Sequence, residues 1–270
     1  MNSHAAFETH PIQKVGCTRS ITLGMAELQP DGISEQWFLK LGGDIHWSLI
    51  AQAMGQKHAV FKDIYGREVY AAFCATSIKL SPQVKLLAKD VEITSSLYHV
   101  SHHQIGSIHK ILLAKQEIAS LLMISTFVSH GEDKANTSIV RNKYMPSLSL
   151  DMAPQELLTL AEYARTAARV NENPETMCGR NQDITPCRSL DFNAVGLLYF
   201  PSFSKFAENF ECQMQKTTQP LKRRDVIYLG NLDIDASINL ASSGTDVFIH
   251  RDDGKLIAKI SSKRCAMSES

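Results

Sequence analysis

Apolar residues recur with the spacing of a helix in the first quarter of the chain. Ser34 is a suitable N-cap, because its hydroxyl can accept a backbone N–H, and an apolar face follows it as far as Leu41. Gly42-Gly43 predicts a break in this helix. Asp44 is then expected to cap a second helix that runs to Gly55.

Beyond Gly66 the pattern changes to the alternation and β-branched composition that are typical of strands. Four runs rich in Ile, Val, Thr and Ser follow one another: 69–78, 91–100, 107–113 and 118–130. The first half is therefore predicted to be a helix followed by an antiparallel meander.

The second half follows the same plan after a different middle. Residues 154–170 predict an amphipathic helix, and residues 171–186, which are polar and hold two prolines, predict a linker. A helix is then expected through Phe203 and Phe210, with a hairpin turn at Asp252-Asp253-Gly254. The expected strands are 226–229, 232–240, 245–250 and 255–262.

Local echoes between the halves, such as Asp90-Val-Glu-Ile-Thr-Ser and Leu232-Asp-Ile-Asp-Ala-Ser, indicate a tandem duplication. A sheet with one apolar face can cover that face by wrapping round its own helix. We therefore expect an α+β double hot dog, with two tandem hot-dog units that each wrap an antiparallel sheet round a helix. The expected boundaries are a flexible N-terminus over 1–20, a first unit over 21–135, a linker with a helix over 136–186 and a second unit over 187–270.

Composition narrows the function classes. The chain has 28 Lys and Arg against 28 Asp and Glu, so no bulk positive charge favours nucleic acid. Apolar runs are too short for a membrane span, and the N-terminus lacks the apolar region of a secretory signal. The 6 cysteines form no CxxC pair, which favours reduced thiols in the cytoplasm and gives no metal signature. Phosphate-binding glycine motifs and a GxSxG elbow are also absent from the sequence.

Several strings resemble the double hot dog biosynthetic family of polyketide and nonribosomal peptide clusters, which includes the leinamycin-pathway acyltransferase/decarboxylase. The strings that carry this resemblance, from about Leu23 to Arg264, are Gly24-Met25, Gly32-Ile-Ser-Glu-Gln-Trp-Phe-Leu-Lys40, Gly43-Asp-Ile-His-Trp47, Gly66-Arg-Glu-Val-Tyr-Ala-Ala-Phe73, Asp191-Phe-Asn-Ala-Val-Gly-Leu-Leu-Tyr-Phe200 and Tyr228-Leu-Gly-Asn-Leu-Asp233. The resemblance implies transfer of a malonyl-type acyl group, with methylmalonyl-CoA favoured, to the phosphopantetheine of an acyl carrier protein, with loss of CO2. It also implies that no cofactor is bound permanently and that the CoA thioester serves as substrate.

The resemblance also implies positions for the site residues. The active-site tyrosine of the family falls on Tyr70, with Tyr65 as a nearby competitor. The asparagine that holds the oxyanion falls on Asn193, with Thr76 or Ser77 opposite. Ala194 stands where the family pattern Asp-Phe-Asn-Gly has glycine, a departure that bears on the substrate more than on the fold.

The chemistry of these residue types agrees with the implied roles but leaves purely structural roles open as alternatives. Decarboxylation needs hydrogen-bond donors at an enolate oxygen, which Asn193 can supply, although a lone asparagine also caps turns. A phenol with a pKa near ~10 is a poor nucleophile, so Tyr70 suits a hydrogen-bonding or acid role. Two alternatives stay open: Tyr70 forms a covalent acyl-tyrosine, or it is a structural aromatic residue of a strand. His46 and Asp44 are candidates for a general base and its partner, with packing and capping as the default.

Two charged clusters complete the set. Lys222, Arg223 and Arg224 form a basic run that suits the phosphates of CoA or an acidic carrier protein, or a solvated strand start. The histidines at 99, 102, 103 and 109 are expected to be solvated turn residues rather than a metal site.

Other functions remain open on the same fold. One is a thioesterase or dehydratase, for which Asp191 and Glu208 are the candidate carboxylates. Another is a module that binds an acyl-carrier thioester without turning it over. The expected partners are an acyl carrier protein and acyl-CoA, with neither nucleic acid nor membrane, and the chain is expected to be a monomer or a homodimer.

Overall fold

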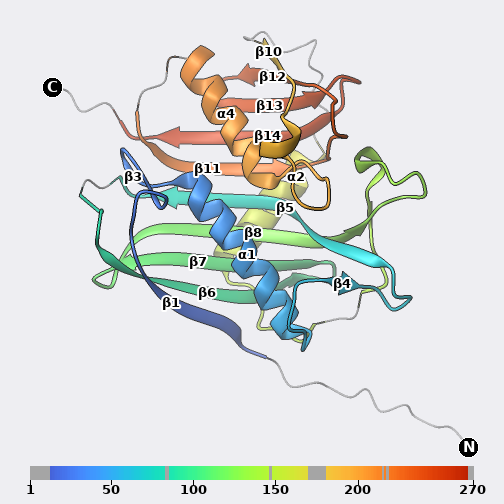
Figure 1. The fold of residues 1–270 in the computed structure, drawn as a ribbon, viewed down its shortest axis with the longest axis horizontal. Helices are drawn as coiled ribbons and strands as arrows, with labels where there is room; N and C mark the ends of the chain where they lie inside the picture. The colour runs from blue at the N-terminus through green and yellow to red at the C-terminus, as the bar shows by residue number, and fades with distance from the viewer. Residues whose placement is uncertain are drawn as a thin grey trace, which may run out of the picture.

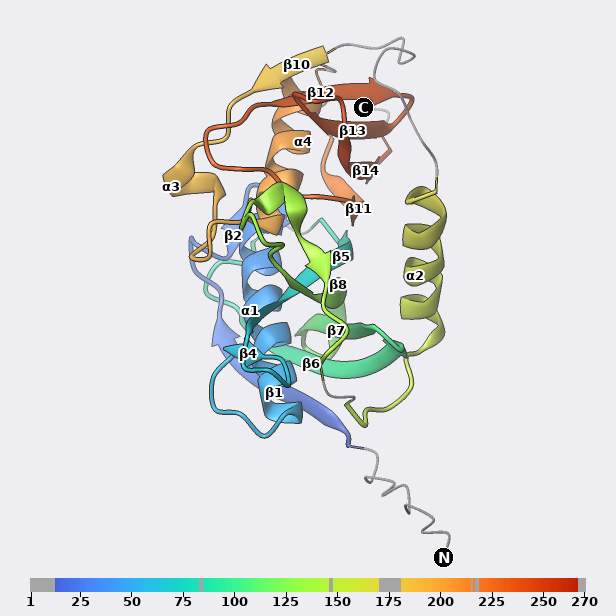
Figure 2. The ribbon, with the colours of Figure 1, turned by 90° about the vertical axis from the view of Figure 1, so that its right-hand side faces the viewer.

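The computed structural model describes residues 13–82, 85–145, 148–169, 181–214, 216 and 219–266. Figure 1 shows one long twisted sheet with two helices, α1 and α4, lying across the same face. Figure 2 shows a third helix, α2, on the opposite face. The molecule is therefore a sheet that carries helices on both sides.

The first unit is built from β1 (Val15–Thr22), α1 (Glu35–Ala53), β5 (Glu68–Leu80), β6 (Asp90–Ser101), β7 (Gln104–Leu113) and β8 (Gln116–Ser129). Its strands lie in the order β1-β6-β7-β8-β5, and every pair is antiparallel. Short strands lie beside this frame: β2 (Leu28–Gln29), β3 (Gly32–Ile33), β4 (Phe61–Lys62) and β9 (Val140–Arg141).

The second unit repeats the plan with β10 (Asn181–Ile184), α3 (Arg188–Asp191), α4 (Phe200–Met214), β11 (Leu221–Tyr228), β12 (Ile238–Ser243), β13 (Asp246–Arg251) and β14 (Leu256–Arg264). Its strands lie in the order β10-β12-β13-β14-β11, which matches the order β1-β6-β7-β8-β5 of the first unit strand by strand. Strands β5 and β11 pair with each other and join the two halves into one sheet. This is the double hot dog that the sequence predicts.

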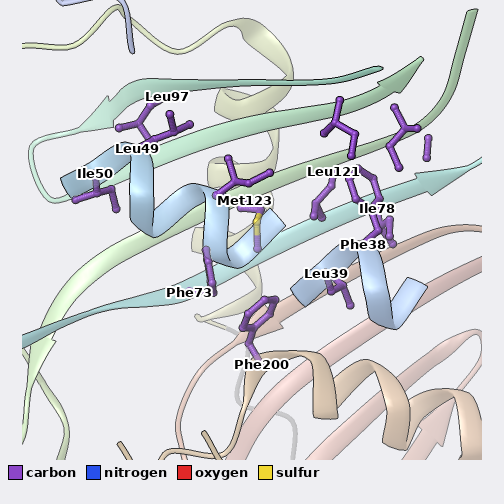
Figure 3. Packing of buried hydrophobic residues seen from close by; sticks show 14 of the residues in the cluster. Phe38, Leu39, Leu49, Ile50, Phe73, Ile78, Leu97, Leu121, Met123 and Phe200 are labelled. Atoms are coloured by element: carbon purple, nitrogen blue, oxygen red, sulfur yellow. The ribbon is translucent and has the colours of Figure 1, made fainter. Parts of the chain in front are cut away.

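Each unit buries its own helix against the sheet. The first core gathers the apolar face of α1 with inward residues of its five strands, and Figure 3 shows Phe38, Leu49 and Ile50 of α1 within it. The second core gathers Phe203, Phe206 and Phe210 of α4 with the second set of strands. Burial of these side chains, at about 25 cal/mol per Å² of apolar surface, is the main stabilising term in both units.

Helix α1 begins as predicted, since the hydroxyl of Ser34 accepts the N–H of Trp37 at 3.3 Å. The predicted break at Gly42-Gly43 is wrong, because α1 continues through it to Ala53. A Cβ on Gly42 would lie 2.5 Å from a Leu121 methyl, and one on Gly43 would lie 2.9 Å from the Phe200 ring. These glycines therefore allow close packing and do not end the helix, so Asp44 lies inside it and is not its cap.

Helix α2 (Gln155–Ala167) covers the outer face of the sheet near the junction of the units. Leu157, Leu160 and Ala161 pack with Ile124 of β8 and Ile227 of β11 in a third cluster. The predicted amphipathic helix is confirmed, and it seals the side of the sheet that α1 and α4 leave open.

The predicted boundaries need correction at three places. Residues 15–20 belong to β1, which pairs with β6, so the N-terminal segment is ordered from Val15 onward. Strand β10 lies inside the predicted linker, of which residues 171–180 fall outside the described part. The strand expected over 232–240 begins only at Ile238, so the echo with Asp90-Val-Glu-Ile-Thr-Ser pairs a strand with a loop.

Within the described ranges, no helix combines the length and the apolar character needed to cross a membrane.

Candidate functional site

A cavity of about 700 Å³ lies where the two units separate. Strand β5 pairs with β11 only over Ala75–Lys79, and beyond Ala75 the two strands diverge. Residues 69–74 of β5 line one wall, and Phe200, Phe203 and Tyr228 of the second unit line the other. Val69 and Ala71 face the α1 core while Tyr70 and Ala72 face the other way, so the cavity reaches both faces of the sheet at this point.

Four of the strings that carry the family resemblance contribute residues to this cavity, and two of them form loops at it. The first is the loop from Phe192 to Phe200 and the second is the loop that follows Tyr228. Asn136 joins them, because its side-chain amide donates to the carbonyls of Gly196 at 2.6 Å and Leu232 at 2.9 Å. Asn231 adds a second tie by accepting the N–H of Leu198 at 2.9 Å. The rim is therefore held by side-chain amides rather than by regular secondary structure.

The geometry of Asn193 is compatible with both roles that the sequence suggests, which are filling a turn and donating a hydrogen bond to an oxyanion. Its amide oxygen accepts the N–H groups of Val195 at 3.1 Å and Leu197 at 3.0 Å, which is the turn-filling role. These bonds fix the orientation of the amide. Among the described residues its NH2 group has no hydrogen-bond partner, and Asn193 lines the cavity. The donor that an oxyanion requires is therefore present at the cavity wall.

The structure distinguishes the two tyrosines. Tyr70 lines the cavity, whereas Tyr65 is 65% exposed and stacks edge-on with Tyr144 outside it. The hydroxyl of Tyr70 donates to a Glu68 carboxylate oxygen at 3.3 Å. Partial burial, and then the charge of Glu68, raise the pKa of Tyr70 above its ordinary value. The phenol therefore stays protonated at neutral pH and suits hydrogen-bond donation better than nucleophilic attack.

Thr76 and Ser77 lie on opposite faces of β5. Thr76 is buried, and its hydroxyl lies 3.1 Å from the hydroxyl of Tyr228, which lines the cavity. Ser77 is buried, and its hydroxyl has no hydrogen-bond partner among the described residues. Thr76 thus reaches the cavity only through Tyr228, and Ser77 does not line it.

Asp44 lines the mouth of the cavity from the middle of α1. Partial burial raises its pKa above the ordinary value, although Arg19 opposes the shift. Tyr199 lines the same mouth, and burial together with the charge of Asp44 raises its pKa to about 12. An exposed carboxylate and a protonated phenol therefore lie close together at the entrance.

His46 lies in the core of the first unit and does not line the cavity. It belongs to a buried chain in which its ring nitrogens contact the hydroxyls of Ser107 and Ser125, each at 2.7 Å. Ser107 in turn contacts His109 at 2.8 Å. Burial holds the pKa of His46 well below 6.5, so it stays neutral in the core. The geometry supports the packing interpretation and not the catalytic one; His109 is likewise buried and not a solvated turn residue.

The histidines of the β6–β7 turn are solvated as predicted, because His102 and His103 are both exposed.

The basic run divides between the two faces of β11. Lys222 and Arg223 are exposed, and Arg223 pairs with Asp225 at 2.9 Å. Arg224 is fully buried and pairs with Glu35 at 2.5 Å, Glu208 at 2.5 Å and Glu211 at 3.0 Å. None of the three lines the cavity, so the prediction that Arg224 meets a phosphate is wrong: its charge is already neutralised by carboxylates.

The carboxylates named for a thioesterase are also engaged elsewhere. Asp191 is buried and pairs with Lys205, and one of its oxygens accepts the N–H of Cys187 at 2.9 Å. Glu208 belongs to the Arg224 cluster. Among the described residues, Asp44 is the one carboxylate that lines the cavity.

Sequence reasoning missed Tyr199, Tyr228 and Lys255, which all line the cavity. Tyr199 and Tyr228 lie near the ends of two strings that carry the resemblance, and this position is the sequence feature that could have identified them. Lys255 follows the Asp252-Asp253-Gly254 turn, which indicated only a hairpin. Lys255 is exposed, and among the described residues it is the one lysine that lines the cavity.

Comparisons with solved structures support the fold. An acyl-ACP thioesterase from Bacteroides thetaiotaomicron is similar over 92% of this chain and 96% of its own, with a TM-score of 0.62 and 6% identity. A 12:0-ACP thioesterase from Umbellularia californica is similar over 94% of this chain and 98% of its own, with a TM-score of 0.62 and 11% identity. A MaoC-like dehydratase from Phytophthora capsici is similar over 96% of this chain and 98% of its own, with a TM-score of 0.50 and 10% identity.

No family model matches the chain, and no curated protein matches it in sequence. At the identities found, the solved structures show that the chain has the hot-dog fold over almost its whole length.

Proposed function

We propose that the protein is a cytoplasmic enzyme that acts on malonyl-type acyl thioesters in the cavity between its two units. In this proposal methylmalonyl-CoA is the favoured substrate, and the acyl group passes to an acyl carrier protein with loss of CO2, as in polyketide-type biosynthesis. CoA thioester and carrier phosphopantetheine are substrates, and no resident cofactor is required.

The observation that carries the proposal is the kind of polar group in the cavity. Its walls are largely aromatic and aliphatic, and several of the residues that line it carry hydrogen-bond donors: the hydroxyls of Tyr70 and Tyr199 and the side-chain amide of Asn193. Loss of CO2 from a malonyl-type thioester moves negative charge onto the thioester oxygen, and donors in a site of low polarity stabilise that charge. Proton abstraction by a buried base is not needed for this step.

Hydrolysis is the second candidate, and one observation favours it. Asp44, the cavity carboxylate, has a raised pKa at the entrance, where it could accept a proton from water. Two neighbours in structure are described as acyl-ACP thioesterases. Asp44 is however exposed at the mouth, which is a poor place from which to activate water at a buried thioester.

The test uses the full chain with methylmalonyl-CoA and a holo acyl carrier protein, and intact mass spectrometry of the carrier. A propionyl adduct is the expected product. A methylmalonyl adduct would retain the transferase and remove the decarboxylase. Free CoA with an unloaded carrier would favour hydrolysis, and this hydrolysis should then be lost in Asp44→Asn.

A matched pair of variants tests the site. Tyr70→Phe removes a hydroxyl inside the cavity, and Tyr65→Phe removes one outside it on the same segment of chain. We expect propionyl transfer to fall by about 10²-fold in the first, as for loss of one transition-state donor, and to be unchanged in the second. Equal activity of both variants would remove Tyr70 from the site.

A further inference from the structure

Tyr228 occupies the point at which the two units separate. It is the last residue of β11, one position past Ile227, where the pairing of β11 with β5 ends. Its ring packs edge-on against Phe203 at 5.2 Å between centroids and against Phe200 at 6.4 Å. Its hydroxyl is thereby held among aromatic residues of the cavity wall.

The hydroxyl of Tyr228 is oriented from both units. Thr76 of the first unit lies 3.1 Å away, and the carbonyl oxygen of Phe200 in the second unit accepts from Tyr228 at 3.4 Å. Either hydroxyl can be the donor in the Thr76–Tyr228 pair, and when Tyr228 donates to Phe200, Thr76 donates to Tyr228. The bond to Phe200 is long for O–H···O, so a better-placed ligand oxygen can replace it at small cost.

Electrostatics distinguishes Tyr228 from Tyr70. The Tyr70 hydroxyl donates to the charged carboxylate of Glu68, whereas the Tyr228 hydroxyl donates to a neutral carbonyl. Burial raises the pKa of Tyr228 above its ordinary value, although the bond from Thr76 opposes this. Tyr228 therefore keeps its proton and has the weaker competing acceptor.

We propose that Tyr228 is the catalytic residue that donates a hydrogen bond to the thioester carbonyl oxygen, and that Thr76 is the positioning residue that aims it. This inference rests on the proposed function and adds to it a donor from the second unit. It also explains how Thr76 contributes without lining the cavity.

The step balances without a further reactant. The bond between the α-carbon and the carboxylate breaks, and CO2 leaves. The released electron pair forms a double bond from the α-carbon to the thioester carbon, whose oxygen becomes an enolate oxygen. Tyr228 holds that oxygen by its O–H and retains the proton, and water supplies the proton that the α-carbon then takes up.

The experiment measures kcat and KM for decarboxylation of methylmalonyl-CoA by the full chain. Tyr228→Phe should lower kcat by about 10²-fold while KM changes by less than about threefold, because the lost bond is strongest in the transition state. Thr76→Val should lower kcat by about 3- to 10-fold, the effect of one neutral hydrogen bond, and Thr76→Ser should restore it.

A double variant separates positioning from a structural role. Thr76→Val combined with Tyr228→Phe should be no slower than Tyr228→Phe alone, since Thr76 acts through the Tyr228 hydroxyl. Trp47 lines the cavity, so its fluorescence reports CoA-ester binding in each variant independently of turnover. Retained binding and an unchanged melting temperature would show that the folded site persists.

The two proposals fail differently. Wild-type protein that releases no CO2 would contradict the proposed function and, with it, this inference. Active wild-type protein with a fully active Tyr228→Phe variant would contradict the inference alone. Multiplicative losses in the double variant would contradict the positioning role of Thr76.

Discussion

The buried histidines of the first unit show how single residues are constrained by the core. His46 and His109 are fully buried and hydrogen-bonded through serine hydroxyls, and His109 contacts Ser95 at 2.9 Å. Burial lowers the pKa of His109 to about 3 and that of His46 well below its ordinary value. Both rings are neutral in the folded protein at physiological pH, so they serve packing and hydrogen bonding.

This burial predicts a specific loss of stability in acid. Below pH ~6.5 these histidines become protonated in the unfolded chain but stay neutral in the folded core, so the free energy of unfolding falls as pH decreases. Each histidine should contribute about 1.4 kcal/mol per pH unit below that point. Urea unfolding between pH 7.5 and 5 measures the slope.

His109→Asn should remove the contribution of one buried histidine from this slope. A slope that is the same in wild type and His109→Asn would contradict the assignment of the buried neutral state.

At the scale of elements, α1 shows why a pair of glycines was misinterpreted. Glycine in a helix interior costs about 1 kcal/mol relative to alanine, so the sequence alone predicts a break. Gly42 and Gly43 are instead placed where β8 and α4 lie close against the helix. That approach depends on Leu121 and Phe200, which lie far away in sequence, and Figure 3 shows both beside α1.

Gly42→Ala should therefore destabilise the protein by about 1–3 kcal/mol, because overpacking outweighs the gain in helix propensity. Ser48→Ala, on the exposed side of the same helix, is the control and should change stability by less than about 0.5 kcal/mol. Thermal unfolding of both variants checks this, and a stabilised Gly42→Ala would show that α1 and β8 are not in close contact.

The elements themselves were largely predictable, and the exceptions have physical causes. The strands from β5 to β8 have strong apolar patterns, and the structure confirms them. Strand β1 has a mostly exposed, polar sequence, and its order comes from backbone pairing with β6, which no local pattern reveals. Strand β10 owes its place to β12 in the same way.

The candidate site was predictable only where a recognisable string carried it. Tyr70 and Asn193 were identified through such strings and do line the cavity. Arg224 was wrongly assigned to phosphate binding because three consecutive basic residues give no indication of which side chain faces the core. In the strand, Arg223 faces outward and Arg224 faces inward. Tyr228 was missed because its contact with Thr76 spans 152 residues of sequence.

At the scale of the whole molecule, the junction of β5 and β11 has a different character at each end. The cavity opens beyond Ala75, and near the other end Arg224, paired across the strands with Ile78, enters a buried charge cluster. This cluster joins Glu35 of α1, Glu208 and Glu211 of α4, and Arg264 of β14. It links the helix of one unit to the helix and sheet of the other, so it fixes how the units meet.

Arg224→Met should destabilise the protein by about 3–5 kcal/mol, because Glu35 would be left buried without its ion-pair partner and Glu211 would lose one of its two arginines. Its neighbour gives a matched control: Arg223→Met removes the pair of an exposed arginine with the half-buried Asp225, which contributes at most about 1 kcal/mol. Urea unfolding at neutral pH compares the two. Equal stabilities would show that the cluster does not hold the units together.

The central claim is that an acyl thioester binds in the cavity between the units. Ala72 lines that cavity from β5 and is half-buried, so Ala72→Phe fills space without removing a donor. Isothermal titration calorimetry of methylmalonyl-CoA into wild type and Ala72→Phe is the most direct measurement. Saturable one-site binding that is lost or weakened more than about tenfold (about 1.4 kcal/mol) in a folded Ala72→Phe variant is the predicted result. Equal affinity in both proteins, or no binding to wild type, would contradict the account.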